Sequence, residues 1–443
     1  MSLTVSTLRT LEKLDKTHNG LTAQELRTVD IDNDGALSVA EAKTAGLAEA
    51  DRALLNRRLT GNLPATAFVF TRSEMESLKV LAPLQTHFDE IDEDHNQLLS
   101  ASEMAAARGN AHYKGEEAAA MAAVFKNLSE LQLLSDDTKI LPKLPQNKYL
   151  DKFPLQSYDE RGLSRKDMER FLELTGKGNS AVSSTVGSFS MVLYSANSAK
   201  APIFANGLES IRFDNVQQGE LGDCYFISAV AALANTPKGK QQIQNMIKEI
   251  GNDYVTVTFP GKLPLTISRP TEGELSMYAS TGNDGMWLPI LEKAYAKLKN
   301  DNPMLLSKAN PYDMIGSGGL LMSGVGVVTG KSTDTDLLML TSTSTLRKKL
   351  TEAARDKRVM TTGTNGSLNP WGKKETDNGL PKGHAYSVLD FDPKTDMVTV
   401  RNPWGNTEVS DGHGPRDGVD DGVFKMPLSE FKSTFDMICY QEK

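Results

Sequence analysis

Cysteine is scarce in this chain, whose 443 residues include only Cys224 and Cys439. Two cysteines cannot form the disulfide framework that stabilises small secreted domains, so we expect a reducing compartment such as the cytoplasm. Apolar runs long enough to span a membrane are absent from the sequence, and residues 1–20 lack the basic start and apolar core of a secretory signal peptide. Export by a route without a cleaved signal stays open.

An excess of positive charge is also missing. The 49 Lys and Arg residues are outnumbered by 57 Asp and Glu residues, which gives a net charge of −8. This balance argues against general nucleic-acid binding. The composition is otherwise that of a globular protein, with 39% hydrophobic residues, and the length allows about two to four domains. The sequence carries no signal for the oligomeric state.

Part of the acidity lies in two stretches that match the twelve-residue calcium loop of EF-hands. The oxygen ligands of the first loop would be Asp30, Asp32, Asp34, the Ala36 carbonyl, Ser38 and Glu41. Those of the second loop would be Asp92, Asp94, Asn96, the Leu98 carbonyl, Ser100 and Glu103.

The two loops differ at the sixth position, where the chain must turn sharply. The first loop has the expected Gly35, whereas the second has Gln97, which must then adopt a strained backbone conformation. We expect Leu37, at the eighth position of the first loop, to pair with a neighbouring loop. Calcium is therefore the expected cofactor.

Three weaker copies of the loop pattern surround these two, at Asp15–Glu25, Leu63–Glu74 and Asp159–Asp167. Too few oxygen atoms converge in them for calcium, so they are interpreted as structural partners.

Apolar residues recur at helical spacing in Met75–Ile91 and Ala118–Leu134. The sequence therefore predicts an all-α, EF-hand-like domain over residues 1–173. Residues 174–204 have little helical period and are predicted to be a linker or a lead-in strand.

A different kind of chemistry is indicated at Gln218–Tyr225, which leads into the apolar segment Phe226–Ala234. Two glycines and Asp223 before an apolar run are typical of a tight loop that enters a buried helix, with Asp223 as its N-cap. Cys224 would then lie in the first helical turn, where unpaired N–H groups and the helix dipole favour a thiolate. A small buried hydrophobic residue is the simpler alternative for a lone cysteine.

Residues far downstream favour the catalytic interpretation. A nucleophilic cysteine needs a general base and a group that orients it, and His384 and Asn402 would fill these roles. Gln218 would donate a side-chain N–H to an oxyanion, next to the backbone N–H of Cys224.

Three strings of residues together resemble the calpain-type cysteine proteases. They are Gln-Gly-x-Leu-Gly-Asp-Cys before residue 225, Gly-His-Ala-Tyr-Ser-Val from 383 and Arg-Asn-Pro-Trp-Gly from 401. Trp287–Lys297 is similar to a helix of the same family, and the resemblance extends from about residue 204 to the end of the sequence.

The resemblance implies a papain-like core of two lobes, so the fold class expected for the whole chain is α+β. A helical lobe over residues 205–335 would carry Cys224, and a mainly β lobe over 336–443 would carry His384 and Asn402. Trp404 would shield the contact between those two side chains from water.

The sequence departs from the family pattern at several positions. Tyr225 stands where the family usually has tryptophan, and Asn215 where an acidic calcium ligand is common. In the second lobe Glu408 and Asp421 match ligand positions, but Val423 replaces an acidic residue. Calcium sites within the lobes are therefore in doubt.

The sequence predicts a calcium-dependent cysteine endopeptidase that acts on proteins or peptides through Gln218, Cys224, His384 and Asn402. Acyl transfer to an amine instead of water would use the same residues. The competing hypothesis is a calcium-binding regulatory or scaffold protein whose catalytically silent core binds peptides.

Overall fold

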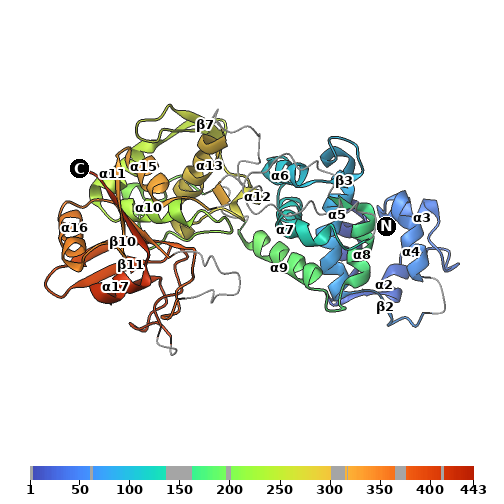
Figure 1. Ribbon diagram of the computed structural model, residues 1–443. Coiled ribbons are helices and arrows are strands. Elements are labelled where there is room, and N and C mark those ends of the chain that lie inside the picture. The colour runs from blue at the N-terminus through green and yellow to red at the C-terminus, as the bar shows by residue number, and fades with distance from the viewer. Residues whose placement is uncertain are drawn as a thin grey trace. The chain divides into compact units, whose positions relative to one another are not determined.

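A computed structural model describes residues 3–59, 63–135, 162–195, 201–300, 315–316, 318–364, 376–410 and 414–443 (Figure 1). The chain divides into two compact units, which are treated separately below. Unit 1 comprises Met1–Asn197 and Thr271–Ser276, and unit 2 comprises Ser198–Pro270 and Met277–Lys443. None of the helices in the described ranges combines the length and apolar character that a membrane-spanning segment needs.

Unit 1 consists of helices around one apolar core, with two short two-stranded ribbons. Its helices are α1 (Val5–Leu14), α2 (Ala23–Arg27), α3 (Val39–Ala45), α4 (Arg52–Leu59), α5 (Arg72–Ile91), α6 (Ala101–Gly109), α7 (Glu116–Leu131), α8 (Arg165–Leu174), α9 (Ser180–Ser195) and α12 (Glu272–Leu275). The ribbons pair β1 (Gly20–Thr22) with β2 (Phe68–Thr71), and β3 (Leu98–Leu99) with β4 (Leu163–Ser164). The helices predicted over 75–91 and 118–134 correspond to α5 and α7.

The ribbons show how the weaker loop copies are used. Leu21 of β1 faces Phe70 of β2, and Leu99 of β3 faces Leu163 of β4. Each of these segments leads directly into a helix whose first turn is closed by a capping box. Such a box satisfies otherwise unpaired N–H groups reciprocally, which accounts for the Ser or Thr followed three residues later by Glu or Asp.

The first complete loop is different, and the expectation for Leu37 is wrong. The Leu37 N–H donates to Asn56 Oδ1 at 2.6 Å, and Asn56 Nδ2 donates to the Leu37 carbonyl at 3.0 Å. The side-chain amide of Asn56, on α4, satisfies the backbone groups that a second loop would otherwise satisfy.

Residues 180–195 form helix α9, which differs from the linker or lead-in strand expected there. Phe189 and Val192 are buried in the core of unit 1, and α9 packs against α7. The serines, valines and glycine of this stretch favour helix only weakly. Burial of its apolar residues against α7 decides the structure.

A short stretch from later in the chain completes unit 1. Helix α12 starts at a capping box between Thr271 and Glu274. The Thr271 hydroxyl donates to the Arg108 carbonyl at 3.0 Å, and the Glu272 carboxylate accepts from the Gly115 N–H at 2.6 Å.

Unit 2 combines helices, a six-stranded antiparallel sheet and a three-stranded antiparallel sheet. Its helices are α10 (Cys224–Ala234), α11 (Pro237–Met246), α13 (Trp287–Asn300), α15 (Leu321–Thr329), α16 (Thr343–Arg355) and α17 (Leu428–Thr434). The larger sheet has the order β12 (Val423–Pro427), β11 (Met397–Arg401), β10 (Ala385–Asp392), β9 (Met360–Gly363), β13 (Met437–Gln441) and β8 (Thr333–Leu337). The smaller sheet has the order β5 (Ile247–Gly251), β6 (Tyr254–Val257) and β7 (Leu265–Ser268).

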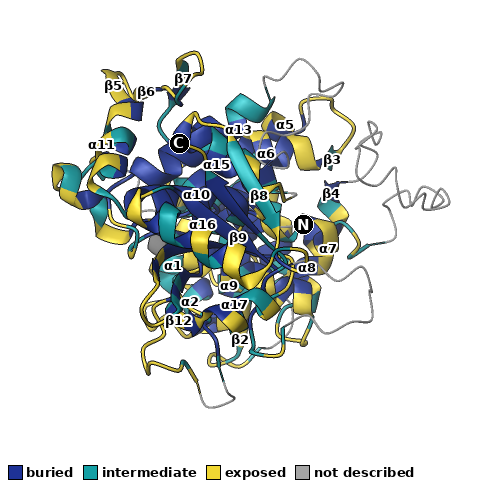
Figure 2. Cartoon of the chain, turned by 60° about the vertical axis from the view of Figure 1, so that its left-hand side comes forward, coloured by how far each residue is buried: buried dark blue, intermediate teal, exposed yellow. Residues whose placement is uncertain are grey.

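Helix α10 lies at the centre of unit 2, and Figure 2 shows its ribbon mostly in the colour of buried residues. Every residue from Tyr225 to Ala234 is buried. The helix packs against α15 on one side and β10 on another. A Cβ atom at Gly324 of α15 would lie 2.1 Å from the Tyr225 carbonyl oxygen, so glycine is required for this close approach.

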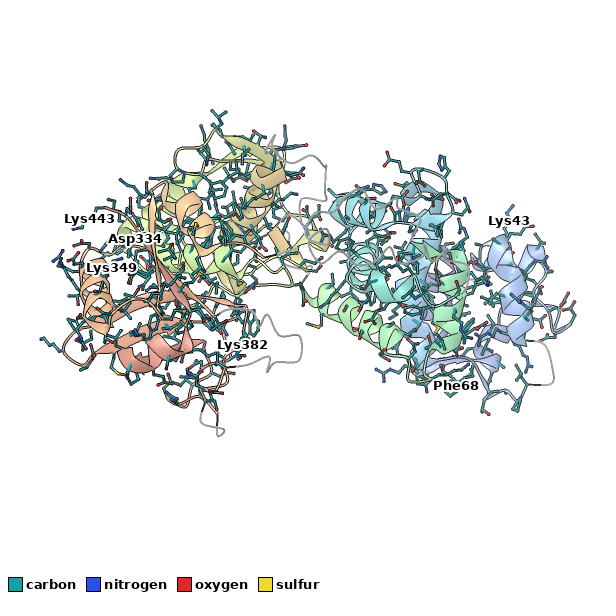
Figure 3. The ribbon with its side chains drawn as sticks, in the orientation of Figure 1. Lys43, Phe68, Asp334, Lys349, Lys382 and Lys443 are labelled. Carbon is teal, nitrogen blue, oxygen red and sulfur yellow. The ribbon has the colours of Figure 1, made fainter. Side chains whose placement is uncertain are left out.

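Strand β8 forms the edge of the large sheet, and the lobe boundary expected after residue 335 falls inside it. Lys349 of α16 holds this edge through Asp334 and Asp336, at 2.8 and 2.7 Å. Figure 3 shows Lys349 next to Asp334. Because β8 pairs with β13 along its whole length, all of β8 belongs to the sheet.

The packing of α9 predicts a contrast between two of its residues. Phe189→Ala should lower the free energy of unfolding by about 3–5 kcal/mol, because it removes a buried ring and leaves a cavity. Met191→Ala, at a position that is 66% exposed on the same helix, should change it by less than about 0.5 kcal/mol. Denaturant unfolding of the full chain measures both values. Equal effects would contradict a core role for α9.

Candidate functional site

Cys224 is the first residue of α10, as the sequence predicts. Asp223 occupies the N-cap position, but its side chain makes no capping hydrogen bond, which corrects the expected role of that carboxyl group. Asp223 is fully buried and faces Glu292 of α13 instead. Cys224 itself is partly exposed, and the Ala385 N–H lies near enough to its sulfur to influence the pKa of the thiol.

The thiol of Cys224 is not acidified in this arrangement, contrary to expectation. Burial raises the pKa of the Cys224 thiol to about 11, and the neighbouring charge of Asp223 adds to the increase. N–H groups of Ala385 and the first helical turn lower it in the direction that the helix start predicts, but they are outweighed. The resting sulfur is therefore a thiol.

His384 and Asn402 lie together, immediately before β10 and immediately after β11. His384 Nε2 is 2.9 Å from Asn402 Oδ1. The Asn402 amide is held on both sides, because Oδ1 also accepts from the Trp404 N–H at 3.1 Å and Nδ2 donates to the Thr407 carbonyl at 2.9 Å. Since Oδ1 can only accept, Nε2 carries the imidazole proton and Nδ1 is left as the basic nitrogen.

The rings around His384 limit its contact with water. The Trp404 ring lies 4.4 Å from the imidazole, centroid to centroid, and the Tyr386 ring lies 4.9 Å away. Trp404 is 37% exposed, so it covers the imidazole from the solvent side. Burial lowers the pKa of His384 to about 4, although the hydrogen bond to Asn402 acts in the opposite direction. The resting imidazole is therefore neutral at physiological pH.

Hydrogen bonds between α10 and β10 hold the helix that begins at Cys224 against the strand that follows His384. The Ser228 hydroxyl donates to the Ala385 carbonyl at 3.0 Å, and the Ser387 hydroxyl donates to the Ser228 carbonyl at 2.8 Å. At the other end of the helix, Asn235 Nδ2 donates to the Leu389 carbonyl at 2.9 Å, where β10 has a bulge. These contacts fix the helix along the strand that His384 precedes.

Gln218 lies in the loop before α10, but its side chain is engaged. Its Nε2 donates to the Leu221 carbonyl at 2.6 Å, while its backbone N–H donates to the Pro403 carbonyl at 2.8 Å. The loop packs tightly on the following segment, since a Cβ at Gly219 would lie 2.3 Å from the Met277 carbonyl oxygen. One of the two N–H donors of the amide that was predicted to receive an oxyanion is thus used by Leu221.

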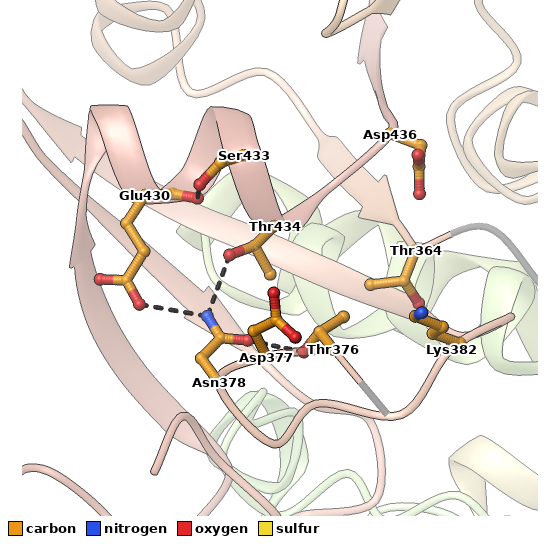
Figure 4. Close-up of a pocket in the computed structure, with 9 residues that line it drawn as sticks. All are labelled: Thr364, Thr376, Asp377, Asn378, Lys382, Glu430, Ser433, Thr434 and Asp436. Atoms are coloured by element: carbon orange, nitrogen blue, oxygen red, sulfur yellow. Dashed lines mark hydrogen bonds between the residues drawn. The ribbon is translucent and has the colours of Figure 1, made fainter. Parts of the chain in front are cut away.

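A polar pocket of about 470 Å³ lies in the same unit (Figure 4). Its lining consists of Thr364, Thr376, Asp377, Asn378, Lys382, Glu430, Ser433, Thr434 and Asp436. Thr364 connects it to the site, because the Thr364 hydroxyl accepts from the His384 N–H at 3.2 Å. Cys224, His384 and Asn402 do not line it.

Carboxylates gather closely enough to share a metal ion at two places in the described part of the chain. The first is Asp30, Asp32 and Glu41. Asp30 Oδ1 is buried without a hydrogen-bond partner among the described residues, and hydrogen bonds from Ser38 lower the pKa of Glu41 to about 2. A buried, unpartnered oxygen and an ionised carboxylate are the donors that a calcium ion requires.

The second place is Asp92, Asp94 and Glu103. Gln97 adopts the left-handed backbone conformation expected of it, with φ of 69°, compared with 87° for Gly35. Its N–H still donates to Asp92 Oδ2 at 3.0 Å, as the Gly35 N–H donates to Asp30 at 2.9 Å. The second loop therefore has the same form as the first, at the cost of a strained residue.

The lobe residues at which calcium ligands are common in the family make other contacts in this structure. Asn215 donates its side-chain amide to Asp284. Glu408 accepts from the N–H groups of Asp421 and Gly422, at 3.0 and 2.7 Å, and burial raises its pKa to about 7. These residues belong to neither carboxylate cluster.

The sequence analysis did not identify Glu292 as part of the site. This glutamate is fully buried on α13 and faces Asp223. The signal was present, because Leu288, Glu292 and Tyr295 share one face of a helix that is otherwise apolar on that side.

Comparisons with known proteins agree with this geometry. The sequence profile of the family described as "Calpain family cysteine protease" matches residues 196–414. The chain is 27% identical over 270 residues to Calpain-13 of Rattus norvegicus, which covers 52% of this chain and 37% of that protein. It is 28% identical over 276 residues to Calpain-12 of Mus musculus, with 52% and 34% covered. It is 30% identical over 219 residues to Calpain-A of Drosophila melanogaster, with 44% and 24% covered.

All these matches fall on one part of each protein. The chain spans about a third of the length of the first curated relatives that it matches. The matched region contains Cys224, His384 and Asn402. Through residues 196–414 this chain belongs to the calpain family of cysteine proteases.

Proposed function

We propose that the protein is a calcium-responsive cysteine endopeptidase that cleaves peptide bonds in protein substrates. The observation that carries the proposal is the pair His384–Asn402, whose hydrogen bonds leave Nδ1 as the basic nitrogen of the imidazole. A peptide-binding protein without catalysis has no need for this tautomer. Family membership supports the same reaction class.

The first half of the reaction is acylation. His384 Nδ1 takes the Cys224 proton while the sulfur attacks the peptide carbonyl, so that an S–C bond forms and the carbonyl oxygen becomes negative. The Cys224 N–H and the Gln218 amide would stabilise that oxygen. The imidazolium then gives its proton to the departing amine as the C–N bond breaks.

The second half is hydrolysis of the thioester. His384 removes a proton from water, the hydroxyl attacks the acyl carbon, and the proton returns to the Cys224 sulfur as the S–C bond breaks. Asn402 keeps the imidazole in one orientation through both halves. Trp404 excludes water from the His384–Asn402 contact, which strengthens that hydrogen bond.

Calcium would be held by the two loops of unit 1. Asp30, Asp32, Asp34, Ala36, Ser38 and Glu41 would supply the first set of oxygens, and Asp92, Asp94, Asn96, Leu98, Ser100 and Glu103 the second. In the first loop, Asn56 binds the backbone of Leu37, and in the second loop, β3 pairs with β4. The two complete loops therefore do not pair with each other. We therefore infer that the two sites bind independently.

One observation favours a second function, that of a calcium-binding protein with a silent, peptide-binding core. The Gln218 amide donates to the Leu221 carbonyl, so one of its two N–H groups is not available to an oxyanion. If this contact holds the amide away from the oxyanion, peptides would bind without being cleaved. The experiments below separate the two functions.

Cleavage of an unfolded protein across a calcium titration tests the proposal. Cys224→Ala should lower kcat/KM by at least about 10³-fold, because it removes the nucleophile. Cys439→Ala, which changes the buried cysteine of β13, is the matched control and should retain activity. Cleavage by wild-type protein only with calcium is the expected result. Its absence at every calcium concentration would favour the silent core.

The raised pKa of Cys224 predicts slow alkylation at neutral pH. The rate of iodoacetamide labelling in the Cys439→Ala background should rise with pH and have no plateau below pH 9, since the thiolate is the reacting form. Peptide mapping at each pH measures it. A plateau below pH 7 would show a resting thiolate instead.

The first calcium loop is tested by Asp30→Asn combined with Glu41→Gln. Loss of two charged ligands should weaken that site by about tenfold or more and leave the second loop unaffected. Glu25→Gln changes the equivalent capping carboxylate of the weaker loop copy at Asp15–Glu25 and should leave calcium binding unchanged. Calorimetric titration gives the stoichiometry, and the cleavage assay gives the calcium midpoint. An unchanged titration would rule out this site.

A further inference from the structure

Two carboxyl groups lie buried behind the nucleophile, and the mechanism above uses neither. Asp223 and Glu292 are 0% and 0% exposed. In the part of the chain that the structure describes, neither carboxylate oxygen of Asp223 accepts a hydrogen bond from an N–H or O–H group. Only one carboxylate oxygen of Glu292 accepts such a bond. Each lies within hydrogen-bonding range of the other.

Among the described residues, no cationic side chain faces this pair. The titratable groups that face it from the packed elements are Cys224 and Tyr225 of α10 and Tyr295 of α13. Two ionised carboxylates cannot remain side by side in an apolar interior without a cation. A single proton between them removes one charge and supplies the missing hydrogen bond.

The pair also connects the two halves of the proposed oxyanion site. Glu292 Oε2 accepts from the Ala279 N–H at 2.6 Å. Residues on either side of Ala279 pair with the loop that carries Gln218: the Glu220 N–H donates to the Met277 carbonyl at 2.9 Å, and Gln217 and Ser280 exchange hydrogen bonds at 2.9 and 2.8 Å. On its other side Glu292 meets Asp223, the residue before Cys224.

We infer that Asp223 and Glu292 share one proton and that Glu292 is a positioning residue, which holds the start of α10 in register with the Gln218 loop. The catalytic consequence rests on the proposed function, whereas the shared proton does not. Burial raises the pKa of both groups, that of Asp223 to about 7, and the charge of Asp223 raises the pKa of Glu292 further.

The sign of the pH effect follows from these directions. In the unfolded chain both groups ionise near their ordinary values, about pH 4, while the folded pair keeps a proton to higher pH. The unfolded chain therefore binds fewer protons between these limits. The pair's contribution to stability is greatest at acid pH and declines as pH rises towards neutrality.

Melting of the full chain in the Cys224→Ala background tests the shared proton without requiring activity. Glu292→Gln keeps the shape and supplies a permanent N–H donor to Asp223, and Asp223→Asn does the converse. The melting temperature of the parent should fall relative to both variants by at least about 4 °C between pH 5 and pH 8. A difference that is constant across pH would overturn the shared proton.

Kinetics at pH 6.5, with Cys224 intact, test the positioning role. Glu292→Gln should lower kcat about threefold or less, whereas Glu292→Leu should lower it at least about 100-fold with little change in KM, since misplacement of the oxyanion donors affects the transition state. Full activity of Glu292→Leu, or equal loss in both variants, would overturn this role. If the wild type cleaves no substrate, the proposed function fails. The melting experiment still tests whether Asp223 and Glu292 share a proton.

Discussion

The contact of α10 with β10 is the constraint on which the site depends. Helix α10 is apolar on all sides, so its faces must be covered, and the sheet, α15, α11 and the Tyr295 ring of α13 cover them. Ser228 and Ser387 then exchange hydrogen bonds with the backbone of the facing element, which fixes the helix along the strand. Register between Cys224 and His384 is thus set one turn along the helix and at the start of the strand, by contacts that involve neither side chain.

The same burial that aligns the site also keeps it neutral. It raises the pKa of Cys224 and lowers that of His384, so both the thiol and the imidazole are uncharged at rest. Moving the proton creates a thiolate–imidazolium pair whose attraction offsets part of the desolvation cost. An ordered substrate that displaces Gln218 from Leu221 would complete the environment in which this charged pair forms.

Much of this arrangement could be predicted from the sequence, because local patterns encode it. The loop before Cys224 and the helices at 75–91 and 118–134 follow from turn residues and periodicity, and the helix from Trp287 follows from the family resemblance. The sequence could not predict α9, whose intrinsic helix propensity is weak and whose burial against α7 decides its structure. The sequence also could not predict the hydrogen bonds of Asn56 with Leu37 or the pairing of Asp223 with Glu292, since both join separate elements. The pKa of Cys224 was predicted in the wrong direction because the helix start is local, whereas the burial that outweighs it is not.

Cys224 should act as a nucleophile only in partnership with His384. Covalent trapping with a peptidyl epoxide, followed by mass-spectrometric mapping of the adduct, measures this dependence. We expect a single adduct on Cys224 that is lost in His384→Ala and retained in Cys439→Ala. Equal labelling of Cys224 with and without His384 would contradict it.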